Sequence, residues 1–222
     1  MTSQSKASER LLLMTNLDPD SRPIEERLRD ATIDPDLWRE MTAELARRAD
    51  AQELLDVAFE RHDSPLGRIL VAATREGVVC VGLPLDDEEA LLEDLARRVS
   101  ARILRAPRAA VTAARGQLDE YFERRRTDFD VPLDWRLTRG FRRQVLEATA
   151  AIPYGETASY AQVAANAGSP RAVRAAGTAL ATNPLPILVP CHRVLRSGGA
   201  MGNYRGGAEA KAQLIALEGG KR

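Results

Sequence analysis

The sequence has few cysteines, histidines and aromatic residues. It contains two cysteines and two histidines among 222 residues, and aromatic side chains make up 5%. Two cysteines cannot build a disulfide framework, and Cys80 and Cys191 with His62 and His192 lack the spacing of a zinc finger. The low cysteine usage predicts a reducing, cytoplasmic setting.

Long apolar runs are also missing. No run approaches the roughly 18 apolar residues that a membrane-spanning helix needs, and Met1 to Arg10 is polar and lacks the apolar core of a secretory signal. The content of 44% hydrophobic and 29% charged residues is ordinary for a globular protein. We therefore expect neither a leader nor any association with a membrane.

The formal net charge of zero hides an asymmetry between the two parts of the chain. From Arg136 to Arg222 there are twelve Lys/Arg against four Asp/Glu, whereas Met1 to Trp135 has twenty against twenty-eight. Such a contrast indicates either that the basic part meets a polyanion or that the two parts neutralise each other.

The first 52 residues are expected to form a helical N-terminal extension of unknown role. Apolar residues recur at helical spacing in 23–30 and again in 36–49, where Asp34-Pro35 is a helix-start signal. Nothing in this extension carries recognisable chemistry.

The sequence of residues 53–135 predicts a small α/β domain with an antiparallel sheet. Three segments alternate or run apolar as strands do, at 55–59, 69–73 and 78–83, with turns at 64–67 and 76–77. Cys80 falls inside the third segment, which predicts a core position. Helices are expected at 86–99 and 107–126.

The sequence of residues 136–222 predicts a helical domain with a helix-turn-helix. A helix is expected at 141–150, and Ser159 is a good N-cap for a helix at 160–167, which Gly168 ends. Pro170 would then open a second helix at 171–181. That helix is rich in small residues and carries two arginines, which favours the minor groove and phosphate contacts over the reading of base edges.

The stretch Pro190-Cys191-His192-Arg193, expected to lie on a strand, unites one of the two cysteines with one of the two histidines. A buried structural cysteine needs no basic neighbours. A nucleophilic cysteine needs a nearby cation or general base to supply thiolate near neutral pH. Both readings stay open on this stretch alone.

The C-terminal region resembles the methylated-DNA–protein-cysteine methyltransferases, also called O6-alkylguanine-DNA alkyltransferases. The resemblance runs from about Phe141 to Gly219, and 53–135 looks like the ribonuclease-H-like domain of that family. An ordered series of motifs carries it: Ile152–Thr157, Ser159-Tyr160, Ala172–Ala175, Asn183–Ile187, Pro190–Val194, Gly202–Gly207, Lys211 and Leu217–Gly219. The implied fold is α+β: this domain followed by an all-α winged helix-turn-helix-like DNA-binding and catalytic domain.

The resemblance implies DNA repair by direct damage reversal. The chain would transfer the O6-alkyl group of guanine, and the O4-methyl group of thymine, irreversibly to its own Cys191 without a cofactor. His192 would act through a water molecule as the base for Cys191, Glu218 would orient His192, and Asn183 would brace the turn beside the cysteine. Lys211 would pair with Glu218.

Double-stranded DNA carrying O6-alkylguanine is the implied partner, bound through its minor groove by a monomer, with cooperative binding left open. Because the alkylated atom lies inside the duplex, the nucleotide must be flipped out. Arg174 would take its place in the stack, and Tyr160 would crowd the 3′ phosphate. The residues implied to line the groove are Ala172, Val173, Ala175, Gly177 and Thr178, and those implied to form the base pocket are Leu180, Val194, Tyr204 and Arg205.

Two departures from the family pattern bear on these expectations. The N-terminal domain has only His62 and Cys80 as soft ligands, so we expect no zinc there. Val173 and Thr178 are bulkier than the alanine and glycine often found at the groove.

The sequence disfavours three other functions. Non-catalytic binders of alkylated DNA, which flag lesions for another pathway, have tryptophan at the cysteine position, so Cys191 disfavours that alternative. The small-residue helix disfavours a sequence-reading transcription regulator, and an adjacent Cys-His is poor evidence for a hydrolase.

Overall fold

The computed structural model describes residues 34–219, and the expected helix at 23–30 lies outside them. The chain divides into two compact units, Met1–Thr42 and Ala43–Arg222. Helix α3, Pro35–Ala51, corresponds to the helix expected at 36–49 and contains the boundary between the units. No helix among the described residues is long and apolar enough to cross a membrane.

The sheet of the second unit has four strands in the order β3-β2-β1-β4. Strands β1 (Val57–Ser64), β2 (Gly67–Ala73) and β3 (Val78–Gly82) form the expected antiparallel meander. The short strand β4 (Ile103–Arg105) pairs parallel to β1, so the sheet is mixed rather than purely antiparallel. Three residues carry too little periodicity to predict such a strand.

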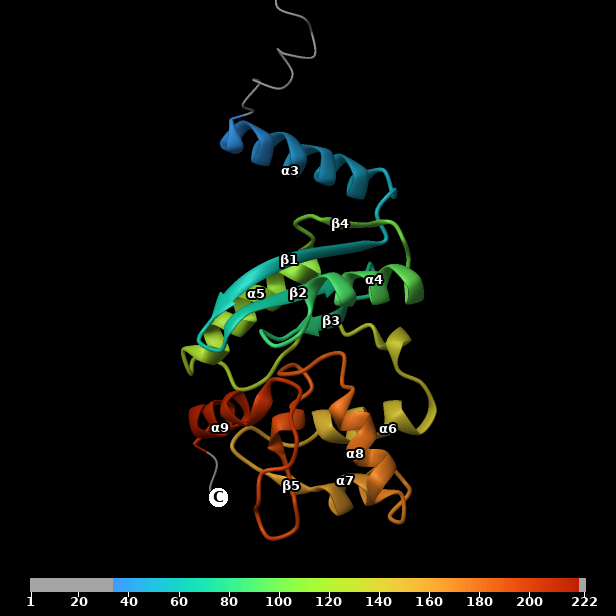
Figure 1. Ribbon diagram of the computed structural model, residues 1–222, viewed down its shortest axis with the longest axis vertical. Helices are drawn as coiled ribbons and strands as arrows, with labels where there is room; N and C mark the ends of the chain where they lie inside the picture. Colours follow the sequence, from blue (N-terminus) through green and yellow to red (C-terminus); the bar gives the residue numbers. More distant parts are fainter. Residues whose placement is uncertain (1–33, 220–222) are drawn as a thin grey trace, which may run out of the picture. The chain divides into compact units, whose positions relative to one another are not determined.

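Both faces of this sheet are covered, because successive side chains on a strand point to opposite faces. Ala58, Ile69 and Val71 belong to the larger buried cluster, which includes residues of α5 (Ala109–Phe122). Val57 and Leu70 belong to a second cluster with α4 (Glu88–Arg98). Figure 1 shows the sheet between these two helices. Helix α5 is shorter than the expected 107–126.

The C-terminal part is mainly helical. It comprises η1 (Trp135–Leu137), α6 (Gly140–Ala150), α7 (Tyr160–Asn166), α8 (Val173–Ala181), η2 (Cys191–Arg193) and α9 (Gly207–Leu217). Strands β5 (Ala158–Ser159) and β6 (Val194–Leu195) add a two-stranded parallel sheet that an all-α prediction leaves out. The larger buried cluster continues from the first sheet into these helices, so one core supports both parts.

The helix-turn-helix is formed by α7 and α8. Ser159 caps α7 in a reciprocal capping box with Gln162, as its residue type predicts. Gly168 follows α7 at a φ of 79°, the left-handed region that glycine adopts without strain. Helix α8 begins at Val173 rather than at Arg171, because a turn closed by Ala172 N–H on the Ser169 carbonyl precedes it.

Candidate active site and nucleic-acid interface

Cys191 begins a single 3-10 turn, η2, rather than lying on a strand as expected. The Arg193 N–H donates to the Pro190 carbonyl over 2.9 Å, and the Cys191 N–H donates to Val189 over 2.8 Å. Proline has no N–H to continue a strand ladder, which favours the turn. Successive side chains of a 3-10 helix lie about 120° apart, so Cys191 and His192 still point in different directions.

Asn183 ties the cysteine to the end of α8. Its Nδ2 donates to the Val189 carbonyl at 2.9 Å and to Cys191 Sγ at 3.2 Å, and its Oδ1 accepts from the Leu185 N–H at 2.9 Å. Asn183 is completely buried. The amide therefore contacts both the loop and the sulfur. The resemblance implies that Asn183 braces this turn and helps to polarise the site.

His192 is completely buried and pairs with Glu218, the C-cap residue of α9. The distance between His192 Nε2 and Glu218 Oε1 is 2.8 Å. Since a carboxylate only accepts, Nε2 carries the proton in this pair. His192 Nδ1 has no hydrogen-bond partner within residues 34–219, so its lone pair is free to accept a proton.

Glu218 collects donors from three further positions. Its Oε1 accepts from Tyr121 Oη at 2.6 Å and from Arg193 Nη2 at 3.0 Å. Its Oε2 accepts from Arg193 Nε at 2.9 Å and from the Gly155 N–H at 3.3 Å. Burial alone raises the pKa of Glu218, but the hydrogen bonds from His192 and Arg193 outweigh it and lower the pKa to about 2. Glu218 is thus held as an anion.

Cys191 and His192 are both uncharged near neutral pH, because each is buried. Burial raises the pKa of the Cys191 thiol, against the opposing hydrogen bond from Asn183. Burial lowers the pKa of His192, against the opposing effect of Glu218. A neutral thiol next to a neutral imidazole with a free lone pair can exchange a proton during reaction. Among the described residues, Cys191 and His192 share no direct hydrogen bond.

Lys211 does not pair with Glu218, contrary to expectation. Its ammonium is completely buried and donates to the Val194 carbonyl over 2.6 Å. Burial lowers the pKa of Lys211, whereas Cys191 raises it. Lys211 thus anchors the segment that follows η2 and adds positive potential toward the sulfur.

Two tyrosines, Tyr160 and Tyr204, lie close enough to Cys191 to interact with it electrostatically. Tyr204 is buried, its ring centroid lies 6.3 Å from that of His192, and its hydroxyl has no partner within the described chain. Tyr160 is half-buried at the start of α7. A Cβ at Gly202 would lie 2.2 Å from the Tyr160 hydroxyl oxygen, so a larger residue there would force the Tyr160 ring to move.

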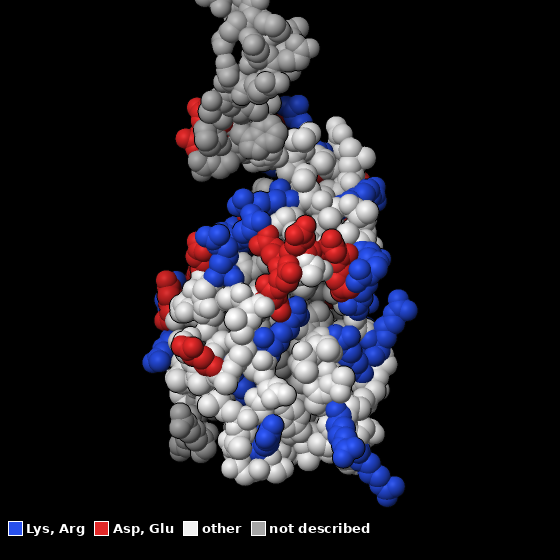
Figure 2. All heavy atoms as spheres, viewed as in Figure 1, with Lys and Arg blue, Asp and Glu red and all other residues white. Residues whose placement is uncertain are grey.

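Helix α8 presents small residues and one arginine to solvent. Arg174, Ala175 and Thr178 are exposed, and Ala172, Val173 and Gly177 are partly exposed, whereas Leu180 and Val194 are buried. Within residues 34–219, Arg139, Arg171, Arg174 and Arg196 have no side-chain hydrogen bond or ion pair in the structure. On the face shown in Figure 2, acidic side chains gather over the sheet, and the charged side chains over the lowest helical part are basic.

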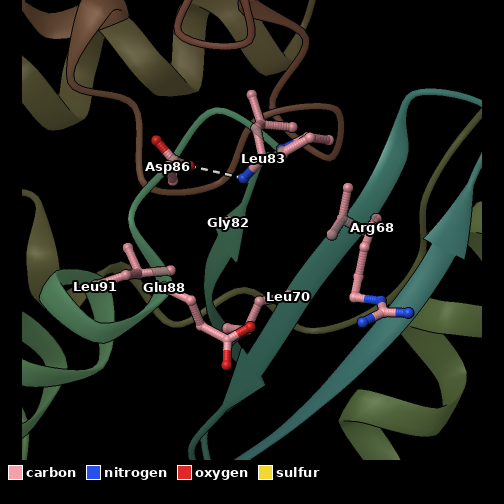
Figure 3. Close-up of a pocket in the computed structure, with 9 residues that line it drawn as sticks. Arg68, Leu70, Gly82, Leu83, Asp86, Glu88 and Leu91 are labelled. Carbon is pink, nitrogen blue, oxygen red and sulfur yellow. Dashed lines mark hydrogen bonds between the residues drawn. The ribbon is translucent and has the colours of Figure 1, made fainter.

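Arg205 has fixed partners, where the sequence predicted a wall of the base pocket. Its Nε donates to Asp86 at 2.7 Å and its Nη1 to the Asn183 carbonyl at 3.2 Å. Asp86 also lines the pocket of about 200 Å³ in Figure 3, which lies over β2, β3 and the start of α4, and accepts from the Leu83 N–H there. None of the other lining residues belongs to the Cys191 site.

Sequence reasoning missed three contributors to this site. Tyr121 and Asp86 come from the sheet part, and no local motif marks them. Arg193 was part of the Pro-Cys-His-Arg motif but received no role, although its guanidinium bridges both Glu218 oxygens. An arginine directly after the histidine was the available signal, since a fork of N–H donors suits a carboxylate.

The fold and site together define a two-part protein: a ribonuclease-like α/β part and a helix-turn-helix part that buries a Cys-His-Glu constellation. Residues 57–135 match the family model described as "6-O-methylguanine DNA methyltransferase, ribonuclease-like domain". Residues 140–220 match "6-O-methylguanine DNA methyltransferase, DNA binding domain".

Similar proteins agree with this match. The inducible methylated-DNA–protein-cysteine methyltransferase of Bacillus subtilis is 37% identical over 67% of this chain and 82% of its own length. The bifunctional transcriptional activator/DNA repair enzyme Ada of Escherichia coli is 38% identical over 80% of this chain and 49% of its own length. The chain thus spans about half the length of that relative. The crystal structure of Mycobacterium tuberculosis OGT in complex with DNA has a TM-score of 0.62 and 34% identity, covering 73% of this chain and 92% of that one. This protein belongs to the 6-O-methylguanine DNA methyltransferase family.

Proposed function

We propose that this protein repairs alkylated DNA by moving the alkyl group from O6 of guanine, and from O4 of thymine, to its own Cys191. The observation that carries the proposal is the arrangement of three buried residues. Cys191 is followed by His192, and Glu218 holds the Nε2 of His192, which leaves the Nδ1 lone pair of His192 free. This is the nucleophile, base and orienting group of cysteine catalysis. The relatives' names supply the substrate class.

The reaction is a displacement at the alkyl carbon. The Cys191 proton passes through a water molecule to His192 Nδ1, and Sγ attacks the carbon. An S–C bond forms, the C–O6 bond breaks, and its electron pair leaves with guanine, which takes up a proton. As His192 becomes positively charged, the adjacent Glu218 anion stabilises it.

We propose that the α7–α8 pair enters the minor groove. The small and partly exposed residues of α8 allow close approach, and the unpaired Arg174 fills the stack after the nucleotide is flipped. Tyr160, next to Gly202, presses on the phosphate at that point. Arg139, Arg171 and Arg196 supply phosphate contacts, so affinity should fall with salt. Leu180, Val194, Tyr204 and Arg205 line the base pocket, and Arg205 is held there by Asp86 and the Asn183 carbonyl. The protein acts as a cytoplasmic monomer.

The product would be a thioether that the protein does not release. Cys80 lies buried in β3, where burial raises the pKa of its thiol to about 12, and it therefore cannot displace the alkyl group. The transfer is expected to be stoichiometric.

Duplex DNA with radiolabelled O6-methylguanine tests this function. Label on the protein should plateau near one equivalent, vanish in Cys191→Ser and persist in Cys80→Ala, the matched thiol control. Folded wild-type protein that acquires no label would refute transfer and leave non-catalytic lesion binding. Label accumulating well beyond one equivalent would refute the single-use mechanism.

A further inference from the structure

A tyrosine of the ribonuclease-like part reaches into the catalytic relay of the other part. Tyr121 lies on α5, 97 positions before Glu218, and is completely buried. Its hydroxyl donates to Glu218 Oε1 over 2.6 Å. The same oxygen lies 2.8 Å from His192 Nε2. Tyrosine and imidazole therefore share one acceptor atom.

The Tyr121 ring is held on several sides, which fixes where its hydroxyl points. Its centroid lies 5.5 Å from Phe122, 5.3 Å from Phe129 and 6.1 Å from Tyr154. Aromatic contacts at these separations are favourable beyond the area that they bury. A phenol held in this way is a preorganised donor, so it helps to orient the carboxylate that Arg193 and His192 also hold.

The shared oxygen links this donor to the strength of the base. Oε1 also accepts from Arg193 Nη2, and the additional donor Tyr121 withdraws further electron density from the carboxylate. This weakens the pull of the carboxylate on the His192 N–H and its stabilisation of an imidazolium. Tyr121 also restricts rotation of the carboxylate. The other charged groups that face this pair are Arg193 from η2 and Lys211 from α9, and both disfavour a charged His192.

We propose that Tyr121 is a positioning residue for alkyl transfer, setting the orientation of Glu218 and through it the basicity of His192. This inference rests on the proposed transfer to Cys191. It gives the ribonuclease-like part a direct share in activating the cysteine.

Tyr121→Phe tests the role because it removes only the hydroxyl and keeps the ring in its packing. Tyr154→Phe is the matched control: its hydroxyl, in the same aromatic cluster, donates to the Leu217 carbonyl and not to Glu218. Single-turnover reaction with free O6-benzylguanine is measured from pH 5 to 9. Tyr121→Phe should react ~10-fold more slowly, the lower end of what loss of a partner that orients a metal-bound histidine or carboxylate costs. The acid limb of its pH profile should move to higher pH by about half a unit.

Two further measurements separate the outcomes. Nuclear magnetic resonance titration of the His192 ring follows its pKa without any substrate, and this pKa should rise in Tyr121→Phe alone. Difluorotyrosine at position 121, a stronger donor, should shift both the His192 pKa and the acid limb the opposite way. Unchanged values in both Tyr121 variants, or equal shifts in Tyr154→Phe, would overturn the inference. Wild-type protein that fails to react refutes the proposed function instead, and the titration still reports on Tyr121.

Discussion

Replacing Glu218 by Gln should destabilise the protein strongly and slow alkyl transfer. The Glu218 carboxylate only accepts hydrogen bonds. Its donors are the Tyr121 hydroxyl, His192 Nε2, Arg193 Nε and Nη2, and the Gly155 N–H. An amide has one acceptor oxygen and one donor nitrogen. In either orientation, the new N–H₂ faces a nitrogen of Arg193, and the buried guanidinium loses its counter-charge.

Two arguments give the magnitude of the stability that Glu218→Gln should lose. Breaking a buried ion pair by removing one partner costs about 3–5 kcal/mol. Independently, the pKa of Glu218 falls from its ordinary 4.5 to about 2 in the folded state. At ~1.4 kcal/mol per pKa unit, this shift represents about 3 kcal/mol of stabilisation of the ionised form. Both point to a loss of about 3–5 kcal/mol near neutral pH.

Urea unfolding followed by circular dichroism measures this loss, and Glu209→Gln provides the control. Glu209 lies on the same helix, α9, but is exposed, so its substitution should change stability by less than about 0.5 kcal/mol. Glu218→Gln should also lower the transfer rate, since His192 loses the anion that orients it. A loss of stability no larger than that of Glu209→Gln would refute the assignment of Glu218 as the buried anion that organises the site.

Two further predictions address DNA and pH. Arg174→Ala should slow repair of duplex DNA far more than reaction with free O6-benzylguanine, because the free base needs no flipping. The control Arg68→Ala, at an exposed position of β2, should slow neither reaction. Equal losses on both substrates in Arg174→Ala would count against insertion of Arg174 into the stack. The pKa of Glu218 is lower in the folded state than in the unfolded state, so its contribution to stability should be complete above pH 4.5 and disappear as pH falls toward 2. Between these pH values, the urea midpoint of Glu218→Gln should therefore fall less than that of the wild type. Parallel curves of urea midpoint against pH would contradict this prediction.

Much of the fold was predictable because its signals are local. The alternation in β1, the apolar run in β2, the Ser159 capping box and the glycine after α7 each involve residues a few positions apart. Strand β4 was missed because it is three residues long and is stabilised by pairing with β1, more than forty positions away.

Of the site, too, only the features with a local signal were predictable from the sequence. The motif of Cys191, His192 and Arg193 was visible in the sequence, as was the resemblance that pointed to Asn183 and Glu218. The 3-10 turn was not, because the Asn183 amide and the Pro190 backbone decide it together. The predicted partner of Lys211 was wrong, because the fold places the Val194 carbonyl, and not Glu218, within hydrogen-bond distance of its ammonium.

The sequence by itself determined which chemistry is present: one cysteine beside a histidine and an arginine, a basic helix-turn-helix of small residues, and a sheet part before it. Only the tertiary structure decided that Tyr121 and Arg193 both donate to Glu218, which lies 97 and 25 positions further along the chain. The physical reason is that burial makes each unpaired polar group costly. Which donors meet a buried carboxylate therefore depends on how the whole core closes, and no local pattern encodes that.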